Sequence, residues 1–276
     1  MQVNMYKEDL ERIATGIRND IVTMITEANS GHPGGSLSAA DIVTTLFFNE
    51  LNINPENPKD ENRDRFVLSK GHAAPVLYSA LARRGFFDPK ELMTLRKIGS
   101  DLQGHPNMND LPGIDMSTGS LGQGISAAVG MALAGKVDKK DYRVYALLGD
   151  GELEEGQVWE ASMCAAHYNL DNLTIFIDFN GLQIDGDITK VMSPCPIDKK
   201  FEAFGWNVLV IDGHNYDEIL GAIEKAKNHK GQPTAIICNT VKGKGVSFME
   251  NEASWHGTAP SKEQCEVAVK ELGGEI

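Results

Sequence analysis

The sequence contains no run of apolar residues long enough to cross a bilayer, and its charged N-terminal segment lacks the apolar stretch of a signal peptide. Cysteine is scarce, and no two of the four cysteines have the Cys-x-x-Cys spacing of a zinc site or a redox pair. Acidic residues outnumber basic ones, and the net charge of -13 argues against nucleic acid, whose phosphates need clustered Lys and Arg. We therefore expect a cytoplasmic protein in a reducing compartment, with neither a membrane nor a nucleic acid as partner.

The 276 residues suffice for one large α/β domain with a sizeable core. Apolar residues recur at helical spacing in some segments and form short, strand-like runs in others. Strands are expected at 65–68, 143–148, 173–179, 206–211 and 234–240, and helices at 8–29, 38–50, 73–84, 89–98, 121–134, 153–168 and 215–229. This alternation predicts βαβ units and thus a parallel sheet with helices on both faces. No repeat or linker interrupts the sequence, so residues 1–276 are expected to form a single domain.

Glycine and proline gather in two segments where we expect loops. Residues 30–35, SGHPGG, form a breaker cluster that should end the first helix. Residues 99–120 are rich in Gly, Pro, Asn and Asp and should form a long loop, and ordered loops of such length usually serve a function. The segment 121–134 is rich in small apolar residues, so we expect a closely packed, buried helix there.

Two oxygen-bearing side chains follow consecutive strands of the predicted sheet. Asp150, within the tripeptide GDG, follows one strand, and Asn180 follows the next. If these strands are parallel neighbours, both side chains lie at the carboxyl edge of the sheet, where open α/β sheets bind ligands. With a main-chain carbonyl near Leu182 they would suit Mg²⁺ or Ca²⁺, and such a cation would let the acidic segment 152–155 hold a phosphate group. The structural alternative is that Asp150 caps a helix and Asn180 closes a turn.

Four of the seven histidines lie in loops rich in glycine or proline: His32, His72, His105 and His256. Neighbouring glycines let the backbone approach a ligand, and an imidazole can bind phosphate, transfer a proton or recognise a hydroxyl group. The spacing is not that of metal ligands, so a zinc site is the weaker interpretation. A structural or surface role stays open for each histidine.

Two further segments could bind an anion. Residues 117–124, STGSLGQG, lead from the long loop into a helix, and their backbone N–H groups could bind an anion or the polar edge of a heterocycle. Tight helix packing explains the same small residues equally well. Lys242 and Lys244 follow the last predicted strand and could neutralise a diphosphate, or they could belong to a solvated loop.

Taken together, these segments resemble the N-terminal, diphosphate-binding half of transketolase, an enzyme that uses thiamine diphosphate (ThDP). The resemblance runs through almost the whole chain and depends on the combination of SGHPGGSLS, SKGHAAPVLY, QGHP, STGSLGQG, GDGELEEGQVWEA, FNGLQIDG, VKGKG and SWHGTAP. It implies the ThDP-binding α/β fold. It also implies transfer of a two-carbon glycolaldehyde unit from a ketose phosphate to an aldose phosphate, as in the pentose phosphate pathway.

The resemblance also assigns roles to individual residues. It implies that the Mg²⁺ or Ca²⁺ ion is held by Asp150, Asn180 and the Leu182 carbonyl. The residues implied to contact ThDP are His72, Gly119, Ser120, Leu121, Gly151, Asn180, Lys242 and His256. Those implied to line the sugar channel and to orient or protonate the substrate are His32, His105 and His256. Glu155 is expected near a contact between subunits.

The departure from the family is length. A complete transketolase is more than twice as long and also carries a pyrimidine-binding domain, a glutamate that activates the cofactor, and arginines that hold the sugar phosphate. We therefore expect one subunit of a transketolase split into two polypeptides, with these features on a C-terminal partner subunit. Because the family's cofactor lies between domains of different protomers, the expected assembly is an α2β2 heterotetramer with sugar phosphates as substrates.

Three other functions are compatible with parts of this pattern. The first is the alpha subunit of a 2-oxo-acid dehydrogenase complex, another split ThDP enzyme. The second is a non-catalytic subunit that kept the fold, and the third is a transketolase for an unusual sugar phosphate. The histidine loops and the segment SWHGTAP favour a sugar substrate over a keto acid, and they fit 1-deoxyxylulose-5-phosphate synthase less well.

Overall fold

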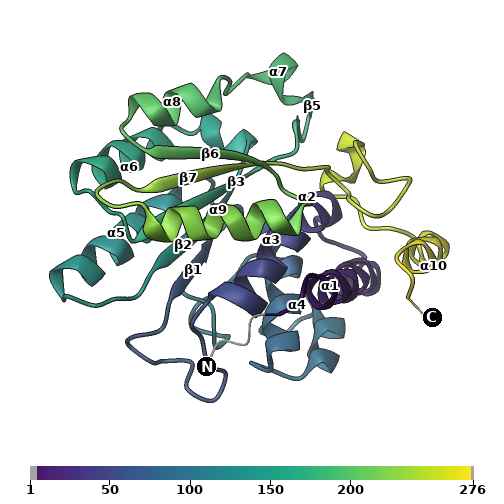
Figure 1. The fold of residues 1–276 in the computed structure, drawn as a ribbon. Helices are drawn as coiled ribbons and strands as arrows, with labels where there is room; N and C mark the ends of the chain where they lie inside the picture. The colour runs from purple at the N-terminus through teal and green to yellow at the C-terminus, as the bar shows by residue number, and fades with distance from the viewer. Residues whose placement is uncertain (1–4, 275–276) are drawn as a thin grey trace.

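The computed structural model describes residues 5–274. Its centre is a five-stranded sheet in the order β1-β2-β3-β7-β6, with all neighbouring strands parallel (Figure 1). The strands are β1 (Arg65–Leu68), β2 (Val144–Gly149), β3 (Leu173–Phe179), β6 (Asn207–Asp212) and β7 (Thr234–Asn239). Each of the five agrees with a predicted strand to within one residue at either end.

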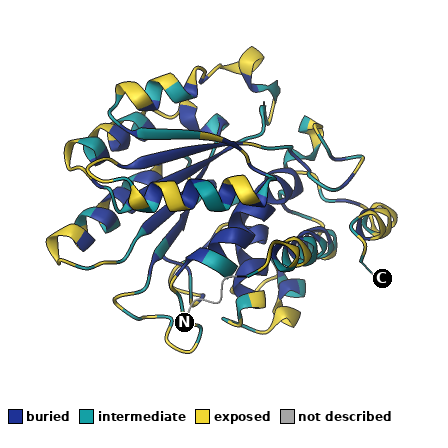
Figure 2. Ribbon diagram, in the orientation of Figure 1, coloured by how far each residue is buried: buried dark blue, intermediate teal, exposed yellow. Residues whose placement is uncertain are grey.

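Helices cover both faces of the sheet because successive strand residues point into two different cores. Tyr145 and Phe176 belong to one core, whereas Ala146 and Ile175 belong to the other. The first face is covered by α1 (Lys7–Ala28), α3 (Ala40–Thr45), α4 (Ala74–Arg84) and α9 (Tyr216–Asn228), and the second by α5 (Gln123–Val137), α6 (Gly156–His167) and α8 (Ile197–Ala203). Figure 2 shows the inner strands buried and the exposed residues on the outer sides of the helices. The predicted parallel sheet with helices on both faces is confirmed, and burial on both sides explains why its strands are continuous apolar runs.

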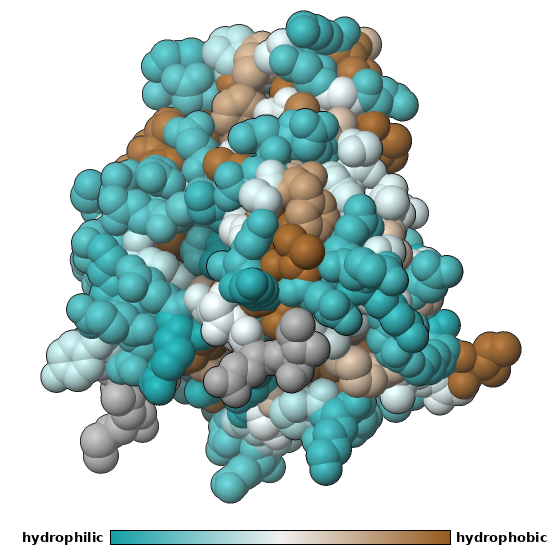
Figure 3. Space-filling model, turned by 90° about the vertical axis from the view of Figure 1, so that its right-hand side faces the viewer, coloured by the Kyte–Doolittle hydropathy of each residue, from teal (hydrophilic) through white to brown (hydrophobic). Residues whose placement is uncertain are grey.

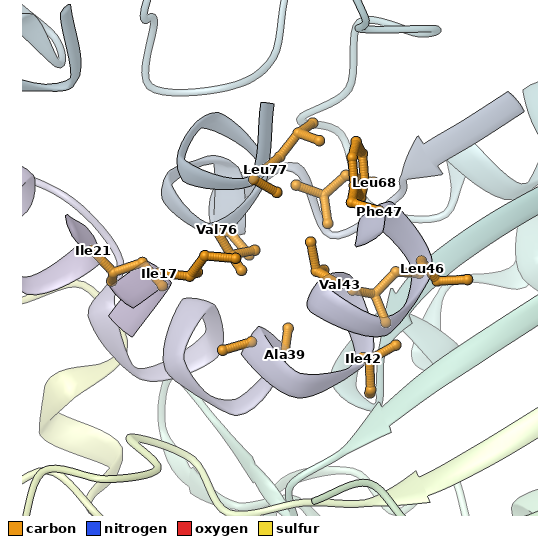
Figure 4. Packing of buried hydrophobic residues seen from close by; sticks show 14 of the residues in the cluster. Ile17, Ile21, Ala39, Ile42, Val43, Leu46, Phe47, Leu68, Val76 and Leu77 are labelled. Atoms are coloured by element: carbon orange, nitrogen blue, oxygen red, sulfur yellow. The ribbon is translucent and has the colours of Figure 1, made fainter. Parts of the chain in front are cut away.

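Helix α1 follows from its periodic apolar residues. Ile17 and Ile21, one turn apart, are fully buried and pack toward Val76 of α4 (Figure 4). The helix ends where Asn29 adopts a left-handed conformation, with φ of 48°, and its N–H bonds to the Thr26 carbonyl. The predicted helix over 8–29 is thereby confirmed.

Some segments fold differently from the prediction. The cluster SGHPGG ends α1, but its second half begins a new helix, α2 (Pro33–Ser38). Pro33 takes the first helical position, where its lack of an N–H group leaves no bond unmade, and every residue of α2 is buried. The predicted helix over 38–50 is instead α3 followed by a π-helical turn, η1 (Leu46–Glu50), and the one over 89–98 is a 3₁₀ helix, η3 (Pro89–Thr94).

Short elements complete the chain, and most of them carry little sequence signal. They are η2 (Gly71–Ala73), η4 (Gly151–Glu154), β4 (Leu182–Gln183), β5 (Gly186–Asp187), α7 (Ile188–Val191), η5 (Ala253–His256) and α10 (Lys262–Glu271). Helix α10 is an exception, because Ser261 and Gln264 form a capping box at its start. Helix α5 is buried on one side only, with Gly130 exposed. Within residues 5–274, no helix has the length and apolar character needed to cross a membrane.

Candidate active site

A cavity of about 240 Å³ lies at the carboxyl ends of the strands. Figure 3 shows this side of the molecule, where hydrophilic residues cover most of the surface and hydrophobic ones form small, separate groups. The predicted site residues that line the cavity are His32, His72, Gly119, Leu121, Asp150, Gly151, Asn180, Leu182, Lys242 and His256. Segments that are far apart in the sequence therefore converge on one site.

Asp150 and Asn180 meet at this edge because β2 and β3 are parallel neighbours. The Asp150 carboxylate accepts hydrogen bonds from the N–H groups of Gly151 at 2.8 Å and Gly181 at 2.7 Å. The Asn180 Oδ1 atom accepts from the Leu182 N–H at 3.2 Å. The structural roles considered for these residues, a cap and a turn, are thus present, and they hold the two side chains together at the cavity.

The oxygen atoms at this point fit a hard divalent cation. Asp150 is only 2% exposed, and burial, together with the nearby Asp178 carboxylate, raises the pKa of Asp150 to about 6. Burial and Asp178 outweigh the nearby Lys70 at this carboxylate, so it would gain from a cation. Carboxylate, amide and carbonyl oxygens are the ligands that Mg²⁺ and Ca²⁺ prefer. Within residues 5–274, no group of three His, Cys, Asp or Glu side chains forms a metal site by itself. A cation held by Asp150, Asn180 and Leu182 would therefore complete its coordination with phosphate oxygens or water.

The raised pKa of Asp150 leads to a test at varied pH. Between about pH 4 and pH 6 the native chain holds a proton on Asp150 that the unfolded chain, with the ordinary pKa of 3.8, has lost. The contribution of Asp150 to the free energy of unfolding of the metal-free chain therefore falls as pH rises through this window. We expect Asp150→Asn to gain up to about 3 kcal/mol of stability relative to wild type between pH 4 and pH 7. Urea unfolding in EDTA at pH 4 and at pH 7 measures the difference in free energy of unfolding between the variant and wild type. An equal difference at the two pH values would contradict the raised pKa of Asp150. The control is Asp141→Asn, at the exposed start of the same strand region.

A buried ion pair joins Lys70, which follows β1 and lines the cavity, to Asp178 of β3. The exposed fractions of the two side chains are 1% and 0%. Lys70 also donates to the Gly35 carbonyl at 2.8 Å, and Asp178 accepts from Ser38 at 2.6 Å and from Thr240. Burial opposes the charge on Asp178, but Lys70 and the hydroxyl donors outweigh it and lower the pKa of that carboxyl group. The pair joins the ends of β1, β3 and β7 to α2.

Replacing Lys70 with methionine should destabilise the chain strongly, because the Asp178 charge would stay buried without its partner. We expect a loss of about 3 to 5 kcal/mol in the free energy of unfolding, measured by urea denaturation at pH 7. The matched control is Lys136→Met, because the ion pair of Lys136 with Asp171 is partly exposed, with side-chain exposures of 38% and 19%. That control should cost less than about 1 kcal/mol. Equal losses of unfolding free energy in the two variants would show that the buried pair contributes no more to stability than the partly exposed one.

Three of the four predicted histidines form a cluster in the cavity. The ring centroids of His32, His72 and His256 lie 5.1 to 5.4 Å apart. Burial and nearby cations lower the pKa of His32 to about 4 and that of His256 to about 3, and they lower the pKa of His72 well below its ordinary value. The cluster therefore offers neutral imidazoles at physiological pH, which can donate and accept hydrogen bonds without carrying charge.

Lys242 contacts both parts of the site. Its Nζ atom donates to the Leu182 carbonyl at 3.2 Å and contacts His256 Nδ1 at 3.0 Å. Burial and Lys70 lower the pKa of Lys242 to about 8, so an anion in the cavity would favour its charged form. The second predicted lysine, Lys244, lies 3.5 Å from Glu250 and does not line the cavity.

Gly243 makes the turn between the two lysines, with φ of 76°, and a Cβ atom there would collide with the Met249 carbonyl.

Two predicted residues lie outside the cavity lining. His105 is exposed and packs beside Gly119. A Cβ atom added at Gly119 would lie only 3.3 Å from the His105 ring. Ser120 is exposed in the same segment. The glycine-rich segment before α5 also offers fewer free N–H groups than expected, because the Gly122 N–H donates to Glu152 at 2.9 Å.

Sequence reasoning missed several buried polar residues at this edge. Glu152 stood out only as an acidic residue that would repel phosphate, yet it is 1% exposed and accepts from Ser69, Gly122 and Gly149. It joins the end of β2 to the segments that contain Ser69 and Gly122. For Asp178 a signal exists, because a single carboxylate inside the apolar strand LTIFIDF calls for a buried cation. Identifying that cation as Lys70 requires the strand order.

Comparison with known proteins shows which proteins the chain is similar to. Residues 10–275 match the family described as "Transketolase, thiamine diphosphate binding domain". The chain is 47% identical to a 6-deoxy-6-sulfo-D-fructose transketolase subunit from a Clostridium species, over 97% of each chain. It is 43% identical to one subunit of the apulose-4-phosphate transketolase of Phocaeicola vulgatus, over 99% of this chain and 96% of that one. The structure of transketolase from Campylobacter jejuni superposes with a TM-score of 0.93 at 37% identity, over 98% of this chain and 44% of that chain.

Proposed function

Because the chain belongs to the transketolase family, in which it matches the thiamine diphosphate binding domain, we propose that it is one subunit of a two-chain transketolase. The proposed reaction transfers a two-carbon glycolaldehyde unit from a ketose phosphate to an aldose phosphate. The observation that carries the proposal is the meeting, in one cavity, of a carboxylate, an amide, a lysine and a cluster of neutral histidines. ThDP, when bound, supplies the group that accepts electrons while the C–C bond of the ketose breaks.

The diphosphate end of the cofactor is proposed to lie at the sheet edge. Asp150, Asn180 and the Leu182 carbonyl would hold the divalent cation, and the cation would hold the two phosphate groups. Lys242 lies on the same side of the cavity and would add a second positive charge. The backbone around Gly119, Leu121 and Gly151, together with His72, would line the rest of the binding surface.

The histidine cluster is proposed to bind the sugar. His32 and His256 line the same cavity and their ring centroids lie 5.4 Å apart, so both can reach hydroxyl or carbonyl oxygens of one substrate. Because both rings are neutral, they can orient the substrate through hydrogen bonds to its oxygens. His105, which is exposed beside Gly119, would contact only a part of the substrate that extends out of the cavity.

The proposed partner is a C-terminal transketolase subunit that carries the pyrimidine-binding domain. Two relatives that are themselves subunits match this chain over nearly their whole length, whereas the chain spans 44% of the Campylobacter jejuni transketolase. We propose an α2β2 heterotetramer in the cytoplasm. Glu155, which is exposed at the start of α6, would lie near a contact between subunits.

The donor sugar has two classes of candidate. Pentose phosphate sugars are the substrates that the family resemblance implies. The names of two similar proteins favour a second class, less usual ketoses, because one refers to a 6-deoxy-6-sulfo-fructose and the other to apulose 4-phosphate. The two-chain complex should be assayed with ThDP, Mg²⁺ and an aldose phosphate acceptor against xylulose 5-phosphate, fructose 6-phosphate, 6-deoxy-6-sulfofructose, apulose 4-phosphate and a 2-oxo acid. Turnover of any one of the ketoses supports a transketolase and identifies its donor. Decarboxylation of the 2-oxo acid alone would refute the proposal.

His256→Ala should weaken the use of both donor and cofactor. His256 touches Lys242 and belongs to the histidine cluster, so its loss removes a hydrogen bond to the sugar and loosens the lysine. We expect kcat/KM for the donor to fall by about 10-fold or more, because a lost hydrogen bond costs about 1 to 3 kcal/mol. Steady-state kinetics of the two-chain complex measure this effect. His229→Ala, at the far end of α9, is the control and should leave the constants unchanged. Unaltered constants for the His256 variant would remove it from the site.

A further inference from the structure

Arg96 holds an unusual position beside the histidine cluster. Its backbone is left-handed, with φ of 58°, and its N–H donates to the Leu102 carbonyl at 2.8 Å. Its guanidinium donates from Nη1 to the Ser30 hydroxyl at 2.8 Å and from Nη2 toward His32 Nδ1 at 3.3 Å. A left-handed backbone at a residue other than glycine is costly, so it persists only where surrounding contacts impose it.

The loop that contains Gly104 is shaped around this guanidinium. A Cβ atom at Gly104 would lie 3.1 to 3.2 Å from three atoms of the Arg96 side chain, closer than such contacts usually are. The Tyr78 hydroxyl fixes the same loop by donating to the carbonyls of Gln103 at 2.8 Å and His105 at 3.2 Å. The segment QGHP therefore has a role that the cofactor site does not explain, which is to make room for Arg96 behind His32.

The contact between Arg96 and His32 decides which ring nitrogen carries the proton. A guanidinium has only donors, so His32 Nδ1 must accept, and a neutral ring then carries its hydrogen on Nε2. The charged and titratable groups that face this ring are Arg96, Lys242, His72, His105 and His256. None of these is a carboxylate, and burial and Arg96 lower the pKa of His32 to about 4, so the ring stays neutral.

We propose that Arg96 is a positioning residue that holds His32 as its neutral Nε2–H tautomer, so that His32 donates a hydrogen bond into the cavity. The acceptor would be a hydroxyl or carbonyl oxygen of the bound sugar, which is the part of the inference that rests on the proposed function. In this state Nε2 has no lone pair to take a proton, and Nδ1 is occupied by Arg96. His32 therefore orients the substrate and is not its general base.

The test uses the full chain with ¹⁵N-labelled histidine and without cofactor. The ¹⁵N NMR spectrum of its imidazole rings is recorded. The His32 signals are assigned by their loss in His32→Gln. In the wild-type chain we expect an unprotonated Nδ1 and a protonated Nε2 at pH 7. Arg96→Met removes the donor and should shift both His32 nitrogens toward the average of a tautomer mixture. Arg96→Lys, which keeps a cationic donor, should restore the Nε2–H form at least in part.

Two further variants keep the result interpretable. Ser30→Ala frees one side of the guanidinium without touching His32 and should weaken the tautomer preference, so it provides the same test if Arg96→Met does not fold. Arg12→Met, at an exposed arginine paired with Asp9, is the control and should leave the His32 signals unchanged. An Nδ1–H tautomer in the wild-type chain would overturn the inference. An Nε2–H tautomer that persists unchanged in a folded Arg96→Met variant would overturn it as well. Because the spectrum is recorded on this chain without a second polypeptide or a substrate, the result is independent of whether the two-chain complex acts on sugars.

Discussion

Asp150→Ala is expected to lower the affinity of the assembled enzyme for ThDP in the presence of Mg²⁺ by about 100-fold or more. Residues that only support metal ligands already cost 10- to 100-fold when lost, and Asp150 would be the single charged ligand of the cation. Without it, the oxygens of Asn180 and Leu182 would face the diphosphate with no metal to neutralise the repulsion. The fold should survive, because the buried Asp150 carboxylate is itself poorly compensated, as its raised pKa shows.

Calorimetric titration of ThDP into the two-chain complex, with Mg²⁺ and with EDTA, measures this effect. In wild type the metal should strengthen binding greatly, whereas in Asp150→Ala the two titrations should agree. Asp141→Ala is the matched control, since that aspartate is exposed at the opposite end of β2 and should leave both titrations unchanged. If the affinity of Asp150→Ala equals that of wild type, Asp150 is not part of the metal site.

The second large effect is expected from the absence of a partner. The purified chain with ThDP, Mg²⁺, donor and acceptor should turn over more slowly than the two-chain complex by about 100- to 10,000-fold, the usual contribution of a positioned proton-transfer group. The family resemblance assigns that group, a glutamate, and the phosphate-binding arginines to the half that this chain does not match. The match to the thiamine diphosphate binding domain spans residues 10–275, nearly the whole chain.

The measurement is a coupled assay of this chain by itself, of a candidate C-terminal subunit by itself, and of their mixture. Activity should rise by this factor only in the mixture and should saturate at equal amounts of the two chains. Size-exclusion chromatography with light scattering then tests the proposed α2β2 composition. Robust turnover by the chain alone would defeat the division of labour between two polypeptides.

The fold was largely accessible from the sequence because burial leaves a strong pattern in it. Strands covered on both faces must be continuous apolar runs, and all five were found within one residue of their ends. The segments that were misjudged are those where tertiary contacts outweigh local preference. Gly34 and Gly35 suggest a break, yet they lie in buried helix α2, where a Cβ atom at Gly34 would meet the Trp255 carbonyl at 2.9 Å. Close approach, and not chain flexibility, explains Gly34.

The sequence by itself determined the parallel sheet and, through the strand ends, the pairing of Asp150 with Asn180. It could do so because parallel strands end at the same edge whatever the rest of the chain does. Only the tertiary structure decided that Lys70 pairs with Asp178, that Lys242 lies beside the Leu182 carbonyl, and that Arg96 faces His32. These partners are 60 or more residues apart in the chain. The protonation states and tautomers of these residues depend on strand order and on the exclusion of water. No local stretch of sequence determines either of them.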